Sequence, residues 1–330
     1  MKDVGLVGVA FSGKSTLFTA LTRSGAAGGR ANQAVVPVPD PRLGVLAGLE
    51  RSAKVVAAQV RFVDVPGGTG SAQGIAALRE TDALCAVLRA FGPDRDPARE
   101  LAEVDAELLL ADMANVESAL ENARRRLKGR SAKEGAGPEV AALEQAQAAL
   151  ASETPLREAG LDAQARQHLR GLAPLTLKPW VVVANLEEGE PVPDGLPADT
   201  VGVYAAIEAE TASMAPDEAR ELLEEFGVKE PGLDGVVRAC YRVLDLITFL
   251  TTGEDETRAW EVRRGATAPE AAGAIHTDLQ RGFIRAEVVS YDELVSAGSW
   301  DAAKQQGHLR VEGKEYVVRE GDVLHVRFAV

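Results

Sequence analysis

The sequence predicts an α/β protein, in which a mostly parallel sheet is covered by helices, interrupted by a helical insertion and followed by a smaller α+β domain. Three observations support this fold class. Almost wholly apolar runs at 83–88 and 180–184 have the length of buried strands. The stretch 97–128 repeats its apolar residues at helical spacing, and short strands are expected after residue 245.

The first element is an apolar run at 4–7, which we expect to be a buried strand. It leads into Gly8-Val9-Ala10-Phe11-Ser12-Gly13-Lys14-Ser15, which has the G-x-x-x-x-G-K-S form of the phosphate-binding loop in P-loop NTPases. A helix is expected at 15–22. Strand, glycine-rich turn and helix are the arrangement that this motif requires, and the alternative is a turn that binds no ligand.

The residue types in this loop suit a polyphosphate. Glycines 8 and 13 allow a tight turn that presents backbone N–H groups, and Lys14 brings a positive charge to the phosphate oxygens. The Ser15 hydroxyl can bind Mg²⁺. We therefore expect nucleotide contacts from Gly8, Ala10, Phe11, Ser12, Gly13, Lys14, Ser15 and Thr16.

A second strand, at 60–65, carries Asp64-Val65-Pro66-Gly67, a D-x-x-G motif of GTPase-type P-loop proteins. The Asp64 carboxylate can hold Mg²⁺ through water, and the Gly67 N–H can meet a terminal phosphate. We expect Ser15 and Asp64 to form the metal site, and Lys14, Asp64 and Gly67 to be the catalytic residues.

The strand at 180–184 ends at Asn185-Leu186-Glu187-Glu188, where GTPases carry N-K-x-D to recognise guanine. Leu186 replaces the lysine, and Glu188 takes the place of the aspartate with a longer side chain. This change favours adenine over guanine, and the alternative is a polar loop without such a role. A fifth strand is expected at 200–204, and Ala205 after it is a further candidate contact with the base.

The insertion should form a helical hairpin. One helix is predicted at 97–128, the pattern breaks at 129–138, a second helix resumes from Val140 to Leu150, and a shorter helix follows at 161–172. Basic residues gather at the tip of this arm: Arg124, Arg125, Arg126, Lys128, Arg130 and Lys133. They indicate either an RNA contact or a solvated helix end whose cations favour the helix dipole.

The C-terminal part should be a small α+β module. A connecting helix is expected at 236–248 and a short one at 269–276, with strands at 260–265, 283–289, 314–318 and 323–328.

Composition limits the function classes. The hydrophobic content of 46% allows a sizeable core, and the net charge of −14 argues against a general binder of naked nucleic acid. Cys85 and Cys240 lie in apolar runs typical of buried thiols, and the four histidines show no metal-ligand spacing. Neither a membrane span nor a secretory leader is evident, so we expect a cytoplasmic protein.

These residues resemble the YchF or Obg-like ATPases, a family of translation-related P-loop proteins. The resemblance rests on 13–18, 36–43, 79–83, 185–188, 258–260, 264–265, 271–273, 275–278, 281–288 and 321–323. It implies ATP rather than GTP as the nucleotide, ribosome binding, and a C-terminal TGS domain with a β-grasp fold. The implied ribosome or rRNA contacts are the TGS domain and the arm, through Arg124, Arg125, Arg126, Lys128 and Arg130.

This chain departs from the family pattern in the two segments that respond to nucleotide. Only 25–33 remains of the first, which lacks the family's metal-binding threonine, and 67–77 is much shorter than the family's second segment. Gln73 is the one candidate near Gly67 for positioning water. The sequence therefore predicts an ATP-binding protein with slow hydrolysis. The alternatives are a binding module without significant turnover and a GTPase.

The expected domains are a nucleotide-binding domain at 1–95 and 175–230, the helical arm at 96–174 and the TGS-like domain at 245–330. The sequence gives no indication of the oligomeric state.

Overall fold

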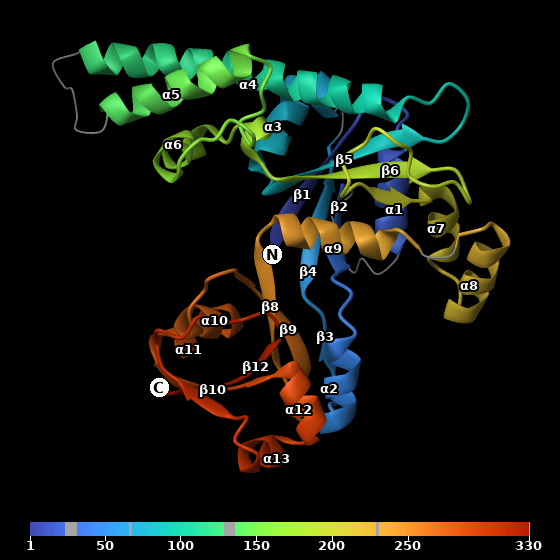
Figure 1. The fold of residues 1–330 in the computed structure, drawn as a ribbon, viewed down its shortest axis with the longest axis vertical. Coiled ribbons are helices and arrows are strands. Elements are labelled where there is room, and N and C mark those ends of the chain that lie inside the picture. Colours follow the sequence, from blue (N-terminus) through green and yellow to red (C-terminus); the bar gives the residue numbers. More distant parts are fainter. Residues whose placement is uncertain (24–31, 66–67, 129–135, 229–230, 330) are drawn as a thin grey trace. The chain divides into compact units, whose positions relative to one another are not determined.

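The computed structural model describes residues 1–23, 32–65, 68–128, 136–228 and 231–329 (Figure 1). The chain divides into two compact units. The larger unit comprises 2–36 and 61–240, and the smaller unit comprises Met1, 37–60 and 241–330.

The larger unit is built on a sheet of six described strands in the order β2-β4-β1-β5-β6-β7. The strands are β1 (Lys2–Val7), β2 (Gln33–Pro37), β4 (Gln59–Asp64), β5 (Ala83–Ala90), β6 (Trp180–Leu186) and β7 (Val201–Val203). Strand β1 pairs in parallel with β5, β5 with β6, and β6 with β7. The predicted α/β class is confirmed, and the five strands expected from the apolar runs are all present.

Helices connect these strands, as Figure 1 shows. They are α1 (Lys14–Arg23), α3 (Ala72–Glu80), α4 (Pro97–Lys128), α5 (Ala136–Ala151), α6 (Ala163–Leu169), α7 (Ala205–Thr211), α8 (Pro216–Glu225) and α9 (Leu233–Val243), with 3₁₀ turns η1 (Gly68–Gly70), η2 (Arg170–Leu172) and η3 (Leu175–Leu177). No helix in the described part of the chain combines the length and the apolarity that crossing a membrane requires.

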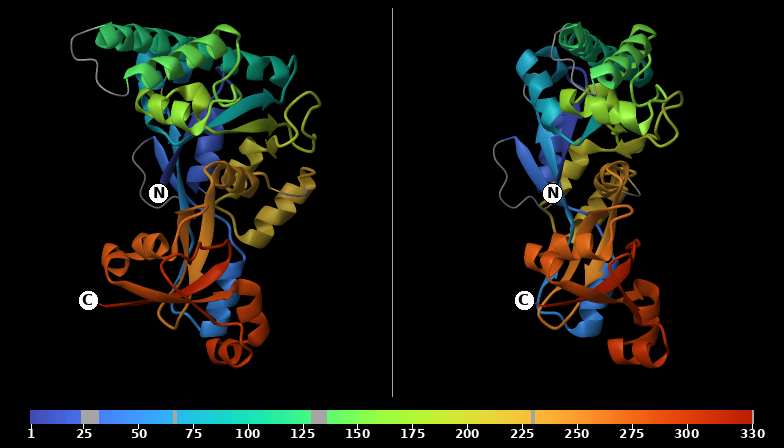
Figure 2. Two further views of the ribbon diagram at one scale, coloured as in Figure 1. Left: turned by 60° about the vertical axis from the view of Figure 1, so that its left-hand side comes forward. Right: turned by 90° about the vertical axis from the view of Figure 1, so that its left-hand side faces the viewer.

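The predicted hairpin arm is formed by α4 and α5, which lie side by side in both views of Figure 2. Their facing apolar residues, among them Leu120, Leu143 and Leu150, are buried in one cluster that also includes residues of α6. Asp112 interrupts the apolar stripe of α4 for a structural reason. Its fully buried carboxylate accepts hydrogen bonds from Arg79 Nη1 at 2.8 Å and Thr176 N at 2.7 Å.

The smaller unit has its own sheet of six described strands, in the order β11-β10-β12-β8-β9-β3. Its elements are α2 (Arg42–Glu50), β3 (Val55–Val56), β8 (Leu246–Thr251), β9 (Thr257–Arg263), α10 (Ala268–Ile275), α11 (Thr277–Arg281), β10 (Phe283–Ser290), α12 (Tyr291–Ala297), α13 (Trp300–Gln305), β11 (Arg310–Glu312) and β12 (Asp322–Phe328). Strand β8 pairs antiparallel with β9 and parallel with β12, and β10 pairs antiparallel with β12 and β11. With α10 between β9 and β10, this is a β-grasp arrangement, as the resemblance implies.

Two predicted elements differ in the structure: one helix is wrong in its extent, and one strand is not formed in the described chain. The connecting helix expected at 236–248 ends at Val243, and Asp245 adopts a left-handed conformation before the buried run 246–251 forms β8. The strand expected at 314–318 is absent from the described chain, where Val317 forms only an isolated bridge to Thr267. Short apolar runs fit either helix or strand by periodicity, so the neighbouring chain decides between them.

Residues 37–60 pack within the smaller unit. Strand β3 pairs in parallel with β9, and the Ser52 hydroxyl donates to the Gly253 carbonyl oxygen at 2.6 Å. Arg42 forms ion pairs with Asp40 at 2.7 Å and Glu320 at 2.6 Å.

Candidate functional site

The N-terminal motif forms a tight turn between β1 and α1. Gly8 and Gly13 have φ angles of 151° and 92°, which favour glycine. A Cβ at Gly8 would lie 2.3 Å from the Val87 carbonyl oxygen, and one at Gly13 would lie 2.1 Å from Asn185 Nδ2. Both glycines are therefore required for the close approach of the loop to β5 and β6.

Lys14 begins α1, and its ammonium group lies over the turn. Its Nζ donates to the carbonyl oxygens of Gly8 and Val9, both at 2.8 Å. Burial lowers the pKa of Lys14, while the fields of Asp64, Glu107 and Glu100 oppose this shift. Within the described residues no ion pair holds Lys14.

Ser15 and Asp64, the expected metal ligands, are brought together from α1 and the end of β4. The Ser15 hydroxyl donates to Asp64 Oδ2 at 3.4 Å. A hydroxyl and a carboxylate suit Mg²⁺, which keeps several waters and takes its remaining ligands from phosphates. No group of three or more His, Cys, Asp or Glu side chains in the described residues forms a denser metal site. Gly67 lies outside the described residues.

The remaining loop positions differ in exposure. Ala10, Ser15 and Thr16 are exposed, whereas Ser12 is fully buried. Phe11 is 89% exposed and has a φ of 64°, an uncommon conformation for a bulky residue. The turn therefore holds a large aromatic ring in solvent beside the phosphate site.

Asn185 joins the phosphate loop to the loop after β7. Its Nδ2 donates to the Ser12 carbonyl oxygen at 3.3 Å, and its Oδ1 accepts from the Ala205 N–H at 3.2 Å. The side chain is 5% exposed. The structure thus brings three predicted site residues, Ser12, Asn185 and Ala205, into one hydrogen-bonded chain.

The three residues that follow Asn185 have different surroundings. Leu186 packs its side chain in an apolar cluster with Ala90 and Ala184. Glu188 is exposed to solvent in the turn after β6. The intervening Glu187 instead accepts from the Gly92 N–H at 3.1 Å, which ties this loop to the loop after β5.

Glu208 is a functional candidate that sequence reasoning missed. It is 2% exposed, and its carboxylate accepts from three backbone N–H groups, those of Tyr204 at 2.9 Å, Gly232 at 2.8 Å and Leu233 at 2.9 Å. Burial raises the pKa of Glu208, against these hydrogen bonds. The side chain therefore fixes the loop that carries Ala205 to the first residues of α9. Only its position three residues after Ala205 could have suggested this role.

A second group that the sequence did not reveal lies on α4. Apolar residues of α4, Val104 and Leu108, share a buried cluster with Val7 and Val65, which flank the candidate site. On the exposed side of the same helix, Glu107 accepts a hydrogen bond from the Thr69 hydroxyl. The negative charges of Glu107 and Glu100, both on α4, act on Lys14 and oppose the lowering of its pKa by burial.

The basic cluster at the tip of the arm is paired with acids. Arg124 binds Glu144 at 2.7 Å, Arg125 binds Glu121 at 3.1 Å, and Arg126 binds Glu139 at 2.7 Å. These arginine side chains stay 51%, 75% and 57% exposed, so solvent still reaches them. The side chain of Lys128 and the residues Arg130 and Lys133 lie outside the described part.

Fold and site together define the class of protein. A sheet in which β1, β5, β6 and β7 run parallel, with a G-x-x-x-x-G-K-S turn after its first strand and an aspartate at the end of β4 beside the serine of that turn, defines a P-loop NTPase of the GTPase-like type.

The comparisons with known proteins identify the family within this class. Residues 246–329 match the family model YchF-GTPase_C, described as a protein of unknown function (DUF933). Proteins named Ribosome-binding ATPase YchF from Haemophilus ducreyi and Bacillus subtilis are 39% and 37% identical over 360 and 364 residues, which cover 99% of both chains in each case. The structure of the Schizosaccharomyces pombe YchF GTPase superposes with a TM-score of 0.88 and 28% identity, over 99% of this chain and 97% of that one. The chain belongs to the YchF family.

The comparison also bears on the shortened segments. The alignment with the Haemophilus ducreyi protein spans 360 positions, whereas this chain has 330 residues. That relative therefore has residues at 30 or more positions where this chain has none. The shortening at 25–33 and 67–77 stays a prediction from the sequence.

Proposed function

We propose that this protein binds ATP with Mg²⁺ at the phosphate loop, hydrolyses it slowly and acts on the ribosome. The observation that carries the proposal is the meeting of Ser15 and Asp64 at 3.4 Å beside the ammonium group of Lys14. The names of the relatives, Ribosome-binding ATPase YchF, support the nucleotide and the partner.

In the proposed phosphate-binding site, the residues divide into phosphate contacts and metal ligands. Lys14 and the backbone N–H groups of the loop hold the phosphates, while Ser15 and Asp64 hold the metal. A bound Mg²⁺ would neutralise charge on the phosphate oxygens. Gly67 is the proposed contact for the terminal phosphate. Lys14, Asp64 and Gly67 are thus the proposed catalytic residues.

Asn185 and the backbone of Ala205 form the proposed binding site for the adenine base. The exposed Glu188 stands where GTPases carry an aspartate, and its longer side chain would misplace the carboxylate that guanine requires. The backbone of Leu186 is the part available to a nucleotide, because its side chain is buried. These features favour ATP over GTP.

Slow turnover follows from the shortened segments. Phosphoryl transfer depends almost entirely on positioning and electrostatic stabilisation, so an incomplete set of contacts around the terminal phosphate reduces the rate more than the affinity. A protein that binds nucleotide without significant turnover is the second candidate, favoured by the 30 or more positions that the chain lacks. The Schizosaccharomyces pombe protein is named a YchF GTPase, so GTP hydrolysis is a further candidate for this chain.

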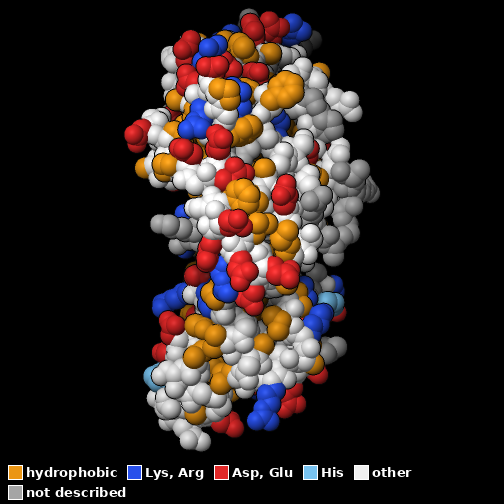
Figure 3. Space-filling view, turned by 90° about the vertical axis from the view of Figure 1, so that its right-hand side faces the viewer, with side chains coloured by type: hydrophobic (Ala, Val, Ile, Leu, Met, Phe, Trp, Pro, Cys, Tyr) orange, Lys and Arg blue, Asp and Glu red, His pale blue; other side chains and the backbone are white. Residues whose placement is uncertain are grey.

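The ribosome contact is proposed for two regions that do not include the phosphate loop, the arm at 96–174 and the TGS-like domain at 245–330. In the arm, Arg124, Arg125 and Arg126 would exchange their glutamate partners for phosphates of rRNA, together with Lys128 and Arg130. Acidic side chains are spread over the face of the molecule in Figure 3, so an RNA contact would have to be local.

Turnover of ATP and GTP, measured with and without ribosomes, tests the proposal. We expect slow ATP hydrolysis that rises when ribosomes are added, because a partner can complete the contacts around the terminal phosphate. Tight ATP binding with no turnover under either condition would instead support the second candidate.

A further inference from the structure

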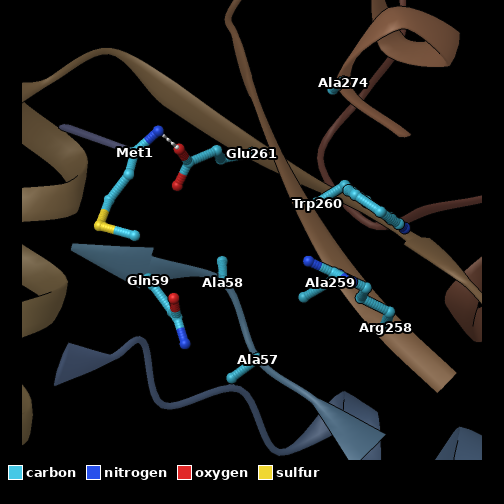
Figure 4. Close-up of a pocket in the computed structure, with 9 residues that line it drawn as sticks. All are labelled: Met1, Ala57, Ala58, Gln59, Arg258, Ala259, Trp260, Glu261 and Ala274. Atoms are coloured by element: carbon cyan, nitrogen blue, oxygen red, sulfur yellow. Dashed lines mark ion pairs between the residues drawn. The ribbon is translucent and has the colours of Figure 1, made fainter. Parts of the chain in front are cut away.

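A cavity of about 340 Å³ lies in the smaller unit, between β9 and the residues that follow β3. Figure 4 shows Arg258 and Trp260 from β9 on one side, and Ala58 and Gln59 on the other. This volume falls at the lower end of the range for small-molecule pockets. The cavity belongs to a different unit from the phosphate loop and is lined in part by the TGS-like domain, which is proposed above as one of the ribosome contacts.

One wall of the cavity is a stack of flat groups. The Arg258 guanidinium carbon lies 4.0 Å from the centre of the Trp260 ring, and that ring stacks on Phe249 with centroids 6.5 Å apart at 16°. Trp260 Nε1 donates to Thr251 Oγ1 at 2.9 Å, which fixes the ring in its plane. In Figure 4 the guanidinium lies on the cavity side of Trp260. The planar guanidinium group of Arg258, stacked on the Trp260 ring, therefore faces the cavity.

The rest of the lining is small and polar. Ala57 and Ala58 leave space for a flat group, and the exposed Gln59 amide can both donate and accept. The Glu261 carboxylate accepts from the Met1 amino group at 2.8 Å and keeps further acceptor capacity. Hydrogen-bonding groups thus lie beside a stacking surface.

These features select the chemistry of a ligand. Arginine planes stack well on the faces of nucleobases, whose edges carry both donors and acceptors. A phosphate is disfavoured, because Glu261 lines the cavity and Glu256 lies 3.6 Å from the Arg258 guanidinium. The recognised part of the ligand is therefore an uncharged ring.

We propose that this cavity is a second nucleobase site, in which an unpaired purine or pyrimidine ring stacks on Arg258 and places its edge against Gln59 and Glu261. The ring can belong to a free nucleoside or to a base turned out of a single RNA strand. Both sources share the same stacking and edge chemistry.

Fluorescence of 2-aminopurine, which stacking quenches, tests this site. The full-length Lys14→Ala protein, whose phosphate loop is disabled, is titrated into a single-stranded RNA hexamer that carries one 2-aminopurine, and adenosine is added as competitor. We expect quenching that Arg258→Ala weakens about 10-fold, in keeping with the usual contribution of one stacked base. Competition by adenosine assigns the site to free nucleosides as well, and quenching without competition assigns it to RNA.

Arg258→Lys separates the plane from the charge, because lysine keeps the cation and loses the stacking surface. We expect it to weaken binding as much as the alanine variant, while Arg264→Ala, which removes an exposed arginine paired with Asp245, leaves binding unchanged. Thermal unfolding of each variant checks that the fold is kept. No quenching in the parent protein, or an Arg258→Lys variant that binds as the parent does, would overturn the proposal.

Discussion

Two regions of the larger unit, the phosphate loop and the tip of the arm, both carry basic side chains that could face phosphates, but these side chains differ in their neighbours. Lys14 donates only to carbonyl oxygens among the described groups, and Asp64 and Glu107 act on it from beyond ion-pair distance. At the tip, Arg124 and Arg126 each pair with a glutamate of α5 at 2.7 Å.

The difference shows what makes a cation available to an anionic ligand. Carbonyl oxygens satisfy the hydrogen-bonding capacity of the Lys14 ammonium group without neutralising its charge. An incoming phosphate therefore interacts with the full positive charge of Lys14. A phosphate that approaches the tip must first displace a glutamate, and an exposed ion pair of this kind contributes roughly 0.2–1 kcal/mol. A cluster of basic residues in sequence is therefore weaker evidence for an anion site than one lysine in a tight turn.

The largest effect is expected at Lys14. Lys14→Ala removes the charge that faces the phosphates, and the affinity for ATP should fall on the order of 100-fold or more, since charge-assisted hydrogen bonds contribute most. Isothermal titration calorimetry measures the change. Lys54→Ala, which removes a lysine paired with Glu256, should leave the affinity as it was.

Asn185→Ala tests the link between the phosphate loop and the base loop. It removes the hydrogen bonds to Ser12 and Ala205, and the loss of two bonds of about 1 kcal/mol each predicts a fall in ATP affinity of up to roughly 30-fold. Asn115→Ala is the matched control, because Asn115 donates to the Leu172 carbonyl oxygen within the arm. Equal losses in both variants would mean that Asn185 acts only through overall stability.

Glu208 extends the comparison to a buried carboxyl group. In the described part of the chain, its hydrogen bonds come from backbone N–H groups alone. Because the pKa of Glu208 is raised in the folded state, the folded protein binds more protons than the unfolded chain between the ordinary value of 4.5 and that raised pKa. The free energy of unfolding should therefore decrease as the pH rises through this window, by up to about 1.4 kcal/mol per pH unit.

Urea unfolding at a series of pH values measures this dependence. Glu208→Gln should flatten the curve in that window, because its side chain does not titrate. Glu225→Gln, at an exposed position of α8, should reproduce the wild-type curve. A Glu208→Gln curve parallel to the wild type would show that another group titrates there.

The smallest effect is expected at the tip of the arm. Exchange of Arg124, Arg125 and Arg126 for glutamine should weaken ribosome co-sedimentation only a few-fold and lower its salt dependence, because the arginines are already paired. Exchange of Glu121, Glu139 and Glu144 for glutamine should strengthen it, since this frees the same arginines. If both triple variants sediment as the wild type does, the tip is a solvated surface.

Much of the fold could be predicted from the sequence. Apolar runs such as 83–88 mark central strands because both faces of a parallel sheet are buried, and the G-x-x-x-x-G-K-S turn fixes the order of strand, loop and helix. The meeting of Ser15 and Asp64 also follows, since the carboxyl ends of parallel strands share one edge.

What the sequence could not reveal depends on contacts between distant segments. The run 246–251 has no period that separates strand from helix, and only pairing with β9 and β12 makes it a strand. Glu208 looks like any helical glutamate until the N–H groups of Gly232 and Leu233, at the start of α9, donate hydrogen bonds to it. The glutamates of α5 likewise neutralise arginines of α4 only once the hairpin has closed.

The affinities for ATP and GTP in the presence of Mg²⁺, compared by calorimetry on the wild-type protein, test the central claim most directly. An intact phosphate loop beside Ser15 and Asp64, with Glu188 in place of the aspartate, predicts that ATP binds and that it binds more tightly than GTP. Tighter binding of GTP, or no binding of either nucleotide, would contradict it.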